Sequence, residues 1–214
     1  IRSHQATEYR MSTYHVYGMG AALVDTEIAI EDTFLANAGI DKGLMTLVDE
    51  PRQEQLLELL SGHLVASRRA SGGSAANSVI AACCFGSRAF YTCKVADDEN
   101  GRFYLADLAR AGVASNPHAA RDPGVTGKCL VMITPDAERT MNTFLGISST
   151  LSAGDLDEAA LRASQFLYIE GYLVTSPSGR AAAVAARRIA ERIEGNVATV
   201  LPDRAERYFS TALM

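Results

Sequence analysis

Apolar and polar positions along the chain predict alternating strands and helices. Short apolar runs that would fill buried strands occur at 14–25, 26–30, 44–48, 89–95, 127–134, 139–145, 166–173 and 197–201. Helical patterns occur between them at 51–60, 75–85, 100–111, 155–163 and 177–194. Because parallel strands need long crossover connections, which are usually helices, this alternation predicts an α/β fold with a mostly parallel sheet and helices on both faces.

Proline and glycine mark several element boundaries. Pro51 and Pro177 stand at predicted helix starts, and Gly86 and Gly112 follow predicted helix ends. The run 135–138 separates two apolar segments and predicts a hairpin. The helix at 75–85 follows a predicted turn at 71–74 and is apolar nearly all round, so we expect it to be buried on every side.

Composition and charge exclude several classes of protein. With 214 residues, 48% of them hydrophobic and 21% charged, the chain can bury a core and is too apolar to be disordered. A net charge of -5 without a basic stripe argues against nucleic acid as a partner. The apolar runs are too short for the ~20 residues of a membrane-spanning helix, so we expect no membrane association.

Cysteine and histidine usage adds little chemistry. The four cysteines show no CxxC spacing, and no signal peptide precedes them, so they predict reduced thiols in a cytoplasmic protein. The four histidines lack metal-ligand spacing, and no metal site is predicted. Residues 1–10 are polar and aperiodic, and we interpret them as a leader that precedes a natural start at Met11.

Two places in the pattern could bind a ligand. Gly72-Gly73 precedes a helix, where unpaired N–H groups attract ligand oxygens, and Asn77 lies one turn into that helix. An equally good reading is that Asn77 merely satisfies a loop carbonyl. Asp25 ends the first apolar run, at the strand edge where open α/β sheets bind ligands, and could accept bonds from two sugar hydroxyls. An aspartate at a strand end is more often a turn or cap residue.

Four short runs, taken together, resemble the ribokinase/adenosine kinase family, also called the phosphofructokinase-B (pfkB) family of carbohydrate kinases. They are G-M-G-A-A-L-V-D at 18–25, S-G-G-S-A-A-N-S at 71–78, V-A-D-D-E-N-G at 95–101 and Y-I-E-G-Y at 168–172. The resemblance implies a ribokinase-like substrate-binding part over 11–194. It also implies a small β lid formed by about 26–48 and 126–146.

The same resemblance implies the site residues. Asp25 would hold the ribose hydroxyls, Gly73 and Ser74 would present backbone groups to the sugar, and Asn77 would bind a sugar hydroxyl. Arg139, at the return of the hairpin, would bring a cation to the site or else be a solvated surface charge. The chain departs from many relatives in having Ala21 where they carry asparagine, which leaves the substrate identity open.

The activity implied is phosphoryl transfer from ATP, with Mg²⁺, to the hydroxymethyl group of a ribofuranoside such as adenosine. The family's late Gly-Ala-Gly-Asp motif, which supplies the ATP site and the catalytic base, is not found, and no GxxxxGK[ST] loop replaces it. We therefore predict no catalytic or metal-binding residue here, a missing C-terminal half, and a chain that binds sugar without turning over ATP. The lid or an exposed sheet edge would form a homo-oligomer.

Two alternatives and one oddity remain. The chain could be a non-catalytic, self-associating module, or a dinucleotide-binding domain, since Gly18-Met19-Gly20 is half of a dinucleotide fingerprint. Segment 195–214 is predicted to be a closing strand and tail. Its last ~15 residues resemble the C-terminal tail of cysteine synthases, so we predict that the tail is foreign to the rest of the chain.

Overall fold

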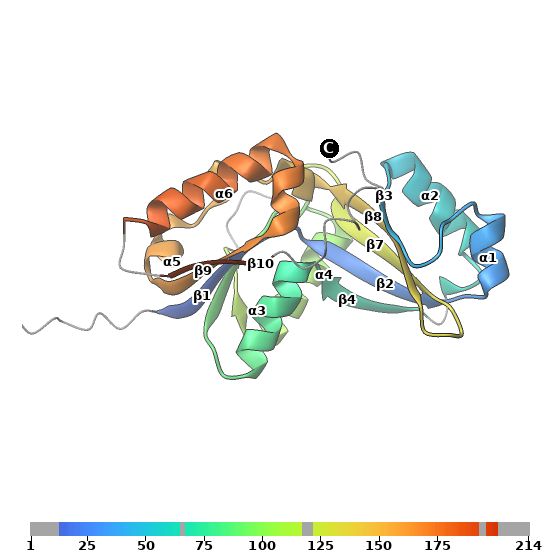
Figure 1. The fold of residues 1–214 in the computed structure, drawn as a ribbon, viewed down its shortest axis with the longest axis horizontal. Coiled ribbons are helices and arrows are strands. Elements are labelled where there is room, and N and C mark those ends of the chain that lie inside the picture. The colour runs from blue at the N-terminus through green and yellow to red at the C-terminus, as the bar shows by residue number, and fades with distance from the viewer. Residues whose placement is uncertain (1–12, 65–66, 117–121, 193–195, 201–214) are drawn as a thin grey trace, which may run out of the picture.

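The computed structural model describes residues 13–64, 67–116, 122–192 and 196–200, which form two five-stranded sheets. Figure 1 shows the first sheet with α3, α5 and α6 on the left, and the second with α1 and α2 on the right. The predicted leader at 1–10 lies outside the described residues, as does most of the predicted tail.

The first sheet is parallel throughout and has the strand order β10-β9-β1-β5-β6. Its strands are β1 (Tyr14–Met19), β5 (Ala89–Thr92), β6 (Val113–Ala114), β9 (Ser164–Glu170) and β10 (Asn196–Val200). Helices α5 (Glu158–Arg162) and α6 (Pro177–Ala190) pack on one face, around Tyr17 and Leu167. Helices α3 (Ser74–Cys84) and α4 (Glu99–Arg110) pack on the other, around Tyr91. This arrangement confirms the predicted α/β class.

The second sheet is mixed and has the order β3-β8-β7-β2-β4. Its strands are β2 (Leu23–Ala29), β3 (Met45–Leu47), β4 (Arg68–Gly72), β7 (Thr126–Ile133) and β8 (Arg139–Gly146). Strands β7 and β8 form the predicted hairpin, whereas β2 and β7 run parallel. Helices α1 (Asp32–Asn37) and α2 (Glu50–Leu59) cover one face through a buried cluster that includes Leu35, Leu56, Ile28, Leu130 and Met132.

Helix starts follow the expected capping chemistry. Asp49 accepts a hydrogen bond from the Arg52 N–H at the start of α2, and Ser176 accepts one from the Gly179 N–H at the start of α6. Three 3₁₀ helices lie in the described part of the chain: Ile147–Thr150, Ala153–Asp155 and Gly171–Thr175. No helix in the described ranges is long and apolar enough to cross a membrane.

The predicted single strand from Tyr14 to Asp25 is wrong. It is two strands in different sheets, β1 and β2, and the chain crosses between the sheets at 20–22. Asp25 therefore lies inside β2 rather than at the C-terminal end of a central strand. The crossing is fixed by distant partners: the Ala21 N–H donates to Glu170 and the Ala22 N–H donates to Ser148.

Two further predictions near 71–85 are wrong. Ser71 and Gly72 belong to β4, which pairs with β2, rather than to a turn. Helix α3 is buried along one face only, and Phe85 beyond its end is 91% exposed. The small residues of α3 let it lie close to the sheet, but its outer face has no cover among the described elements.

Candidate functional site

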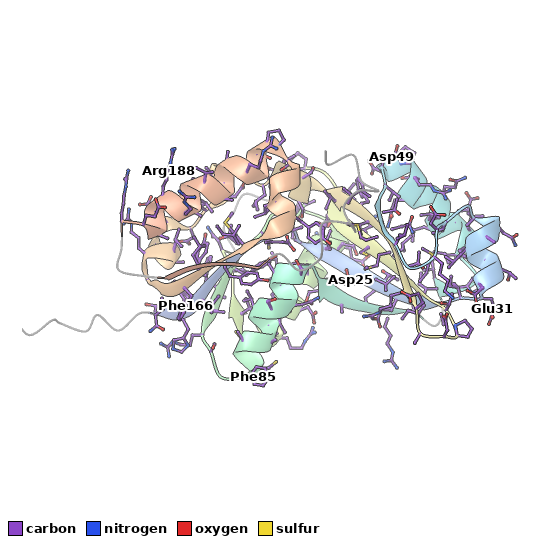
Figure 2. All side chains as sticks on the ribbon, in the orientation of Figure 1. Asp25, Glu31, Asp49, Phe85, Phe166 and Arg188 are labelled. Atoms are coloured by element: carbon purple, nitrogen blue, oxygen red, sulfur yellow. The ribbon has the colours of Figure 1, made fainter. Side chains whose placement is uncertain are left out.

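Asp25 lies in β2, paired with Ala70 of β4 on one side and Cys129 of β7 on the other. Successive residues of a strand point to opposite faces, so Asp25 and Glu27 share the face opposite to Ile28. Ile28 packs against α1 and α2, which leaves Asp25 on the face that these helices do not cover. Figure 2 shows Asp25 near the junction of the two sheets.

The glycine turn before α3 touches Asp25 directly. A Cβ atom at Gly72 would overlap the Asp25 carboxyl group, so only glycine fits beside that carboxylate. Gly73 follows with a φ of 101°, which favours glycine, and a Cβ there would lie 2.6 Å from the Ala21 carbonyl oxygen. The structure thus brings Asp25 next to the turn that leads into the predicted Gly73-Ser74 segment, although Asp25 and Gly73 are 48 positions apart in the sequence.

The Asp25 carboxyl group is electrostatically strained. Burial raises its pKa to about 6, the neighbouring charge of Glu27 adds to the rise, and Arg139 opposes it. Within the described part of the chain, no hydrogen bond from a side chain or backbone N–H reaches the Asp25 carboxylate. An ionised, largely buried carboxylate without a protein donor is a strong acceptor for ligand hydroxyls.

Ser74 is the first residue of α3, and its hydroxyl is already engaged. It donates to Glu170 Oε1 at 2.5 Å, and the Ala75 N–H donates to the same oxygen at 3.2 Å. The Ala21 N–H donates to Oε2 at 2.7 Å. Glu170, at the end of β9 and only 2% exposed, therefore holds the 20–22 crossing against the start of α3.

Asn77 and Arg139 occupy more open positions. Asn77 is exposed on the first turn of α3, so the prediction that it projects from a buried helix is wrong, and within the described residues no hydrogen bond holds its side-chain amide. Arg139 begins β8 and forms an exposed ion pair with Glu27. Arg139 acts on the site through its ion pair with Glu27 and through its charge, which lowers the pKa of Asp25, rather than by contact with the glycine turn.

Sequence reasoning missed Glu170 as a site residue, although Y-I-E-G-Y was among the runs singled out. The available signal was a carboxylate at the end of a buried strand, the same pattern that drew attention to Asp25. The described residues contain no cluster of three or more histidine, cysteine, aspartate or glutamate side chains that could hold a metal ion. The site is built from the Asp25 carboxylate, a glycine turn held by Glu170, and an exposed amide.

Comparison with known protein families identifies the family of this chain. The model of the pfkB family carbohydrate kinases matches residues 52–213. The chain belongs to the pfkB family of carbohydrate kinases. This confirms the resemblance seen in the sequence, and the match includes α3, β9 and most of the closing segment 195–214.

Individual relatives of this pfkB chain include nucleoside and sugar kinases. It is 28% identical to an adenosine kinase of Schizophyllum commune over 171 residues, which are 77% of this chain and 48% of that protein. It is 31% identical to a 5-dehydro-2-deoxygluconokinase of Halalkalibacterium halodurans over 124 residues, 56% of this chain and 38% of that protein. The chain thus spans about half the length of the curated relatives it matches, or less.

Solved structures show the same fold. The adenosine kinase of Sinorhizobium meliloti is 34% identical and superposes with a TM-score of 0.81, over 90% of this chain and 57% of that one. A probable sugar kinase of Rhizobium etli is 30% identical, with a TM-score of 0.83 and the same coverage. The pfkB chain therefore has the ribokinase-like fold of these kinases over part of their length.

Proposed function

We propose that this chain forms the acceptor side of an adenosine-kinase-like enzyme, which transfers the γ-phosphoryl group of ATP to the hydroxymethyl group of a ribofuranoside. The observation that carries the proposal is the Asp25 carboxylate, largely buried and without a protein donor, against the glycine turn of a carbohydrate kinase fold. The adenosine kinases among the relatives favour a nucleoside over a simple sugar.

Each site residue has a definite part in the proposal. Asp25 accepts hydrogen bonds from two ribose hydroxyls, since an ionised carboxylate has lone pairs for both. Gly73 and Ser74 present backbone groups to the sugar, and the exposed Asn77 amide binds a further hydroxyl. Arg139 is paired with Glu27, and its positive charge lowers the pKa of Asp25 and so favours the ionised carboxylate. The second sheet is the lid in this scheme.

ATP and Mg²⁺ are not assigned to residues of this chain. Kinases of this family use ATP, and Mg²⁺ is the general expectation for phosphoryl transfer. Among the described residues there is no cluster of three or more metal-binding side chains and no glycine-rich phosphate loop with a lysine, so neither group is placed on a residue of this chain. We therefore expect the 214-residue chain to bind a nucleoside without phosphorylating it.

Thermal unfolding with and without ligand tests the proposal. Adenosine at 100 times its Kd should stabilise the chain by about 2.7 kcal/mol, and ribose should stabilise it less at the same concentration. AMP formation from ATP and adenosine, measured in parallel, should stay at the background level. Absence of any nucleoside-dependent stabilisation would refute the acceptor site, whereas AMP formation by the pure chain would refute only its predicted inactivity.

Self-association of the chain through the lid or an exposed sheet edge stays a prediction.

The affinity for nucleoside should depend on pH through Asp25. Its pKa of about 6 means that the carboxylate is ionised at neutral pH and mostly protonated at about pH 5, where it loses acceptor capacity. We expect the Kd for adenosine to rise roughly 10-fold from about pH 7.5 to about pH 5, because one pH unit below the pKa leaves about a tenth of the group ionised. Isothermal titration calorimetry across this range measures it, and a Kd independent of pH would contradict the assignment.

A further inference from the structure

A second concave site lies on the other face of the second sheet. It is a cleft of about 360 Å³ between the segment that follows α1, strand β3, the start of α2 and strand β8. Figure 2 shows Asp49, at the start of α2, well separated from Asp25. A volume of this size falls within the usual range of small-molecule sites.

One wall of the cleft contains a buried amide without a partner. Asn142 lines the cleft, is only 3% exposed, and its Nδ2 has no hydrogen-bond partner among the described residues. Its cross-strand neighbour Leu130 belongs to the cluster under α1 and α2, so Asn142 points to that side of the sheet. An unsatisfied buried donor costs about 1–3 kcal/mol. A ligand acceptor would remove that cost.

The remaining polar groups define which ligand fits. Asp41, Thr46 and Asp49 also line the cleft, and Asp49 Oδ1 already accepts from the Arg52 N–H as the cap of α2, which leaves its second carboxylate oxygen for a ligand. Arg52 is the cation of the cleft, and its guanidinium already donates to the Ala38 carbonyl oxygen and to Gln55. Two carboxylates against one engaged guanidinium make the lining net negative, which disfavours phosphate and other anions. The described residues also lack a metal-binding cluster.

We propose that this cleft binds a small, uncharged polyhydroxylated compound, with Asn142 donating to one of its oxygens and Asp41 and Asp49 accepting from its hydroxyls. Such a compound both donates and accepts, as the mixed lining requires. The site is independent of the proposed nucleoside site, because the two lie on opposite faces of the sheet. The two sites are nevertheless close to each other within the sheet. Asp25 pairs with Cys129, and Cys129 pairs with Thr143, the residue next to Asn142.

Amide NMR of the full 214-residue chain tests the proposal, with ribitol as the probe and inorganic phosphate as the charged comparison. Ribitol should cause saturable shifts confined to residues 39–49, Arg52 and Asn142, and phosphate should cause none there. The shifts should remain in Asp25→Asn and disappear in Asn142→Leu, which replaces the unpartnered amide by an apolar side chain of similar size.

A matched control comes from α2. Gln53 is 1% exposed and its amide is also unpartnered, but it does not line the cleft. Gln53→Met should therefore leave ribitol binding unchanged, and both variants should be at least as stable as the parent chain, because each removes an unsatisfied buried amide. The proposal is overturned if ribitol gives no saturable shifts, if Asn142→Leu binds as well as the parent chain, or if phosphate binds in preference.

Discussion

Asp25→Asn is expected to weaken nucleoside binding at least 100-fold while making the unliganded chain more stable. Asparagine has nearly the shape of aspartate, so the glycine turn at Gly72 still fits beside it. Its amide offers one acceptor oxygen in place of two charged ones. Hydrogen bonds to charged groups contribute about 1.5–3 kcal/mol each and neutral ones about 0.5–1.5 kcal/mol, so losing one bond and weakening the other amounts to about 100-fold or more in affinity. Calorimetric titration with adenosine measures this loss.

The stability gain follows from the direction of the Asp25 pKa shift. Burial raises that pKa from 3.8 to about 6, so the folded chain binds the proton more tightly than the unfolded chain does. Ionisation therefore costs folding free energy, a cost that is absent below about pH 4 and complete above pH 6. Two pKa units correspond to about 3 kcal/mol, which partial solvent access reduces to about 2 kcal/mol. Asp25→Asn removes this cost.

Urea unfolding of the parent chain and of Asp25→Asn tests this stability gain. The variant should be more stable than the parent at about pH 8 and equally stable at about pH 4. Glu27→Gln is the matched control, since Glu27 lies on the same face but is half-exposed and paired with Arg139. It should change stability by less than about 1 kcal/mol. A destabilised Asp25→Asn chain at the higher pH would contradict our interpretation of Asp25 as a strained ligand-binding carboxylate.

Glu170→Gln is expected to lower the free energy of unfolding by about 2–4 kcal/mol, the largest loss we predict for an isosteric substitution. Three donors converge on this carboxylate: the N–H groups of Ala21 and Ala75, and the Ser74 hydroxyl. A glutamine NH₂ group must face at least one backbone N–H, which leaves that donor buried without an acceptor. Urea unfolding gives the magnitude.

Hydrogen exchange distinguishes a positioning role for Glu170 from a general loss of stability. We expect the amides of Ala21 and Ala75 to lose more protection in Glu170→Gln than those of the central strand β1. We also expect the affinity for adenosine to fall, because the 20–22 crossing leads directly into β2 and Asp25. Ser74→Ala, which removes one donor and leaves both backbone bonds, should show a smaller change in each measurement. Uniform loss of protection with unchanged adenosine affinity would restrict Glu170 to a structural role.

Local patterns were enough to predict most elements but not their assignment to sheets. The hairpin of β7 and β8 and the helices α2, α4 and α6 follow from turn residues, caps and periodicity close in sequence. The split of the first apolar run into β1 and β2 does not, because Glu170, about 150 residues away, and Ser148 fix the crossing. A strand at 68–72 was likewise hidden, since Ser71-Gly72 has the composition of a turn and becomes strand only by pairing with β2.

The candidate site divides in the same way. Asp25 and Gly73 were found from their residue types and from family motifs, and the structure places Gly72, the neighbour of Gly73, against the Asp25 carboxyl group. The pKa of Asp25 could not be predicted, because it depends on burial and on Glu27 and Arg139 across two strands. The unpartnered amide of Asn142 was equally hidden, since an asparagine in a strand shows nothing of its cross-strand environment until β8 is paired.

The positions of the strands along the chain also determine the order in which the two sheets can form during synthesis. Every strand of the second sheet lies between Leu23 and Gly146, whereas the first sheet cannot place β9 beside β1 until Ser164–Glu170 has been made. Chains fold during synthesis as their parts become complete, and pairings between distant strands form late. The sheet that carries Asp25 can therefore form while the ribosome is still producing the strand that ends in Glu170. The nascent chain would then hold Asp25 in its sheet before Glu170 is available to fix the 20–22 crossing.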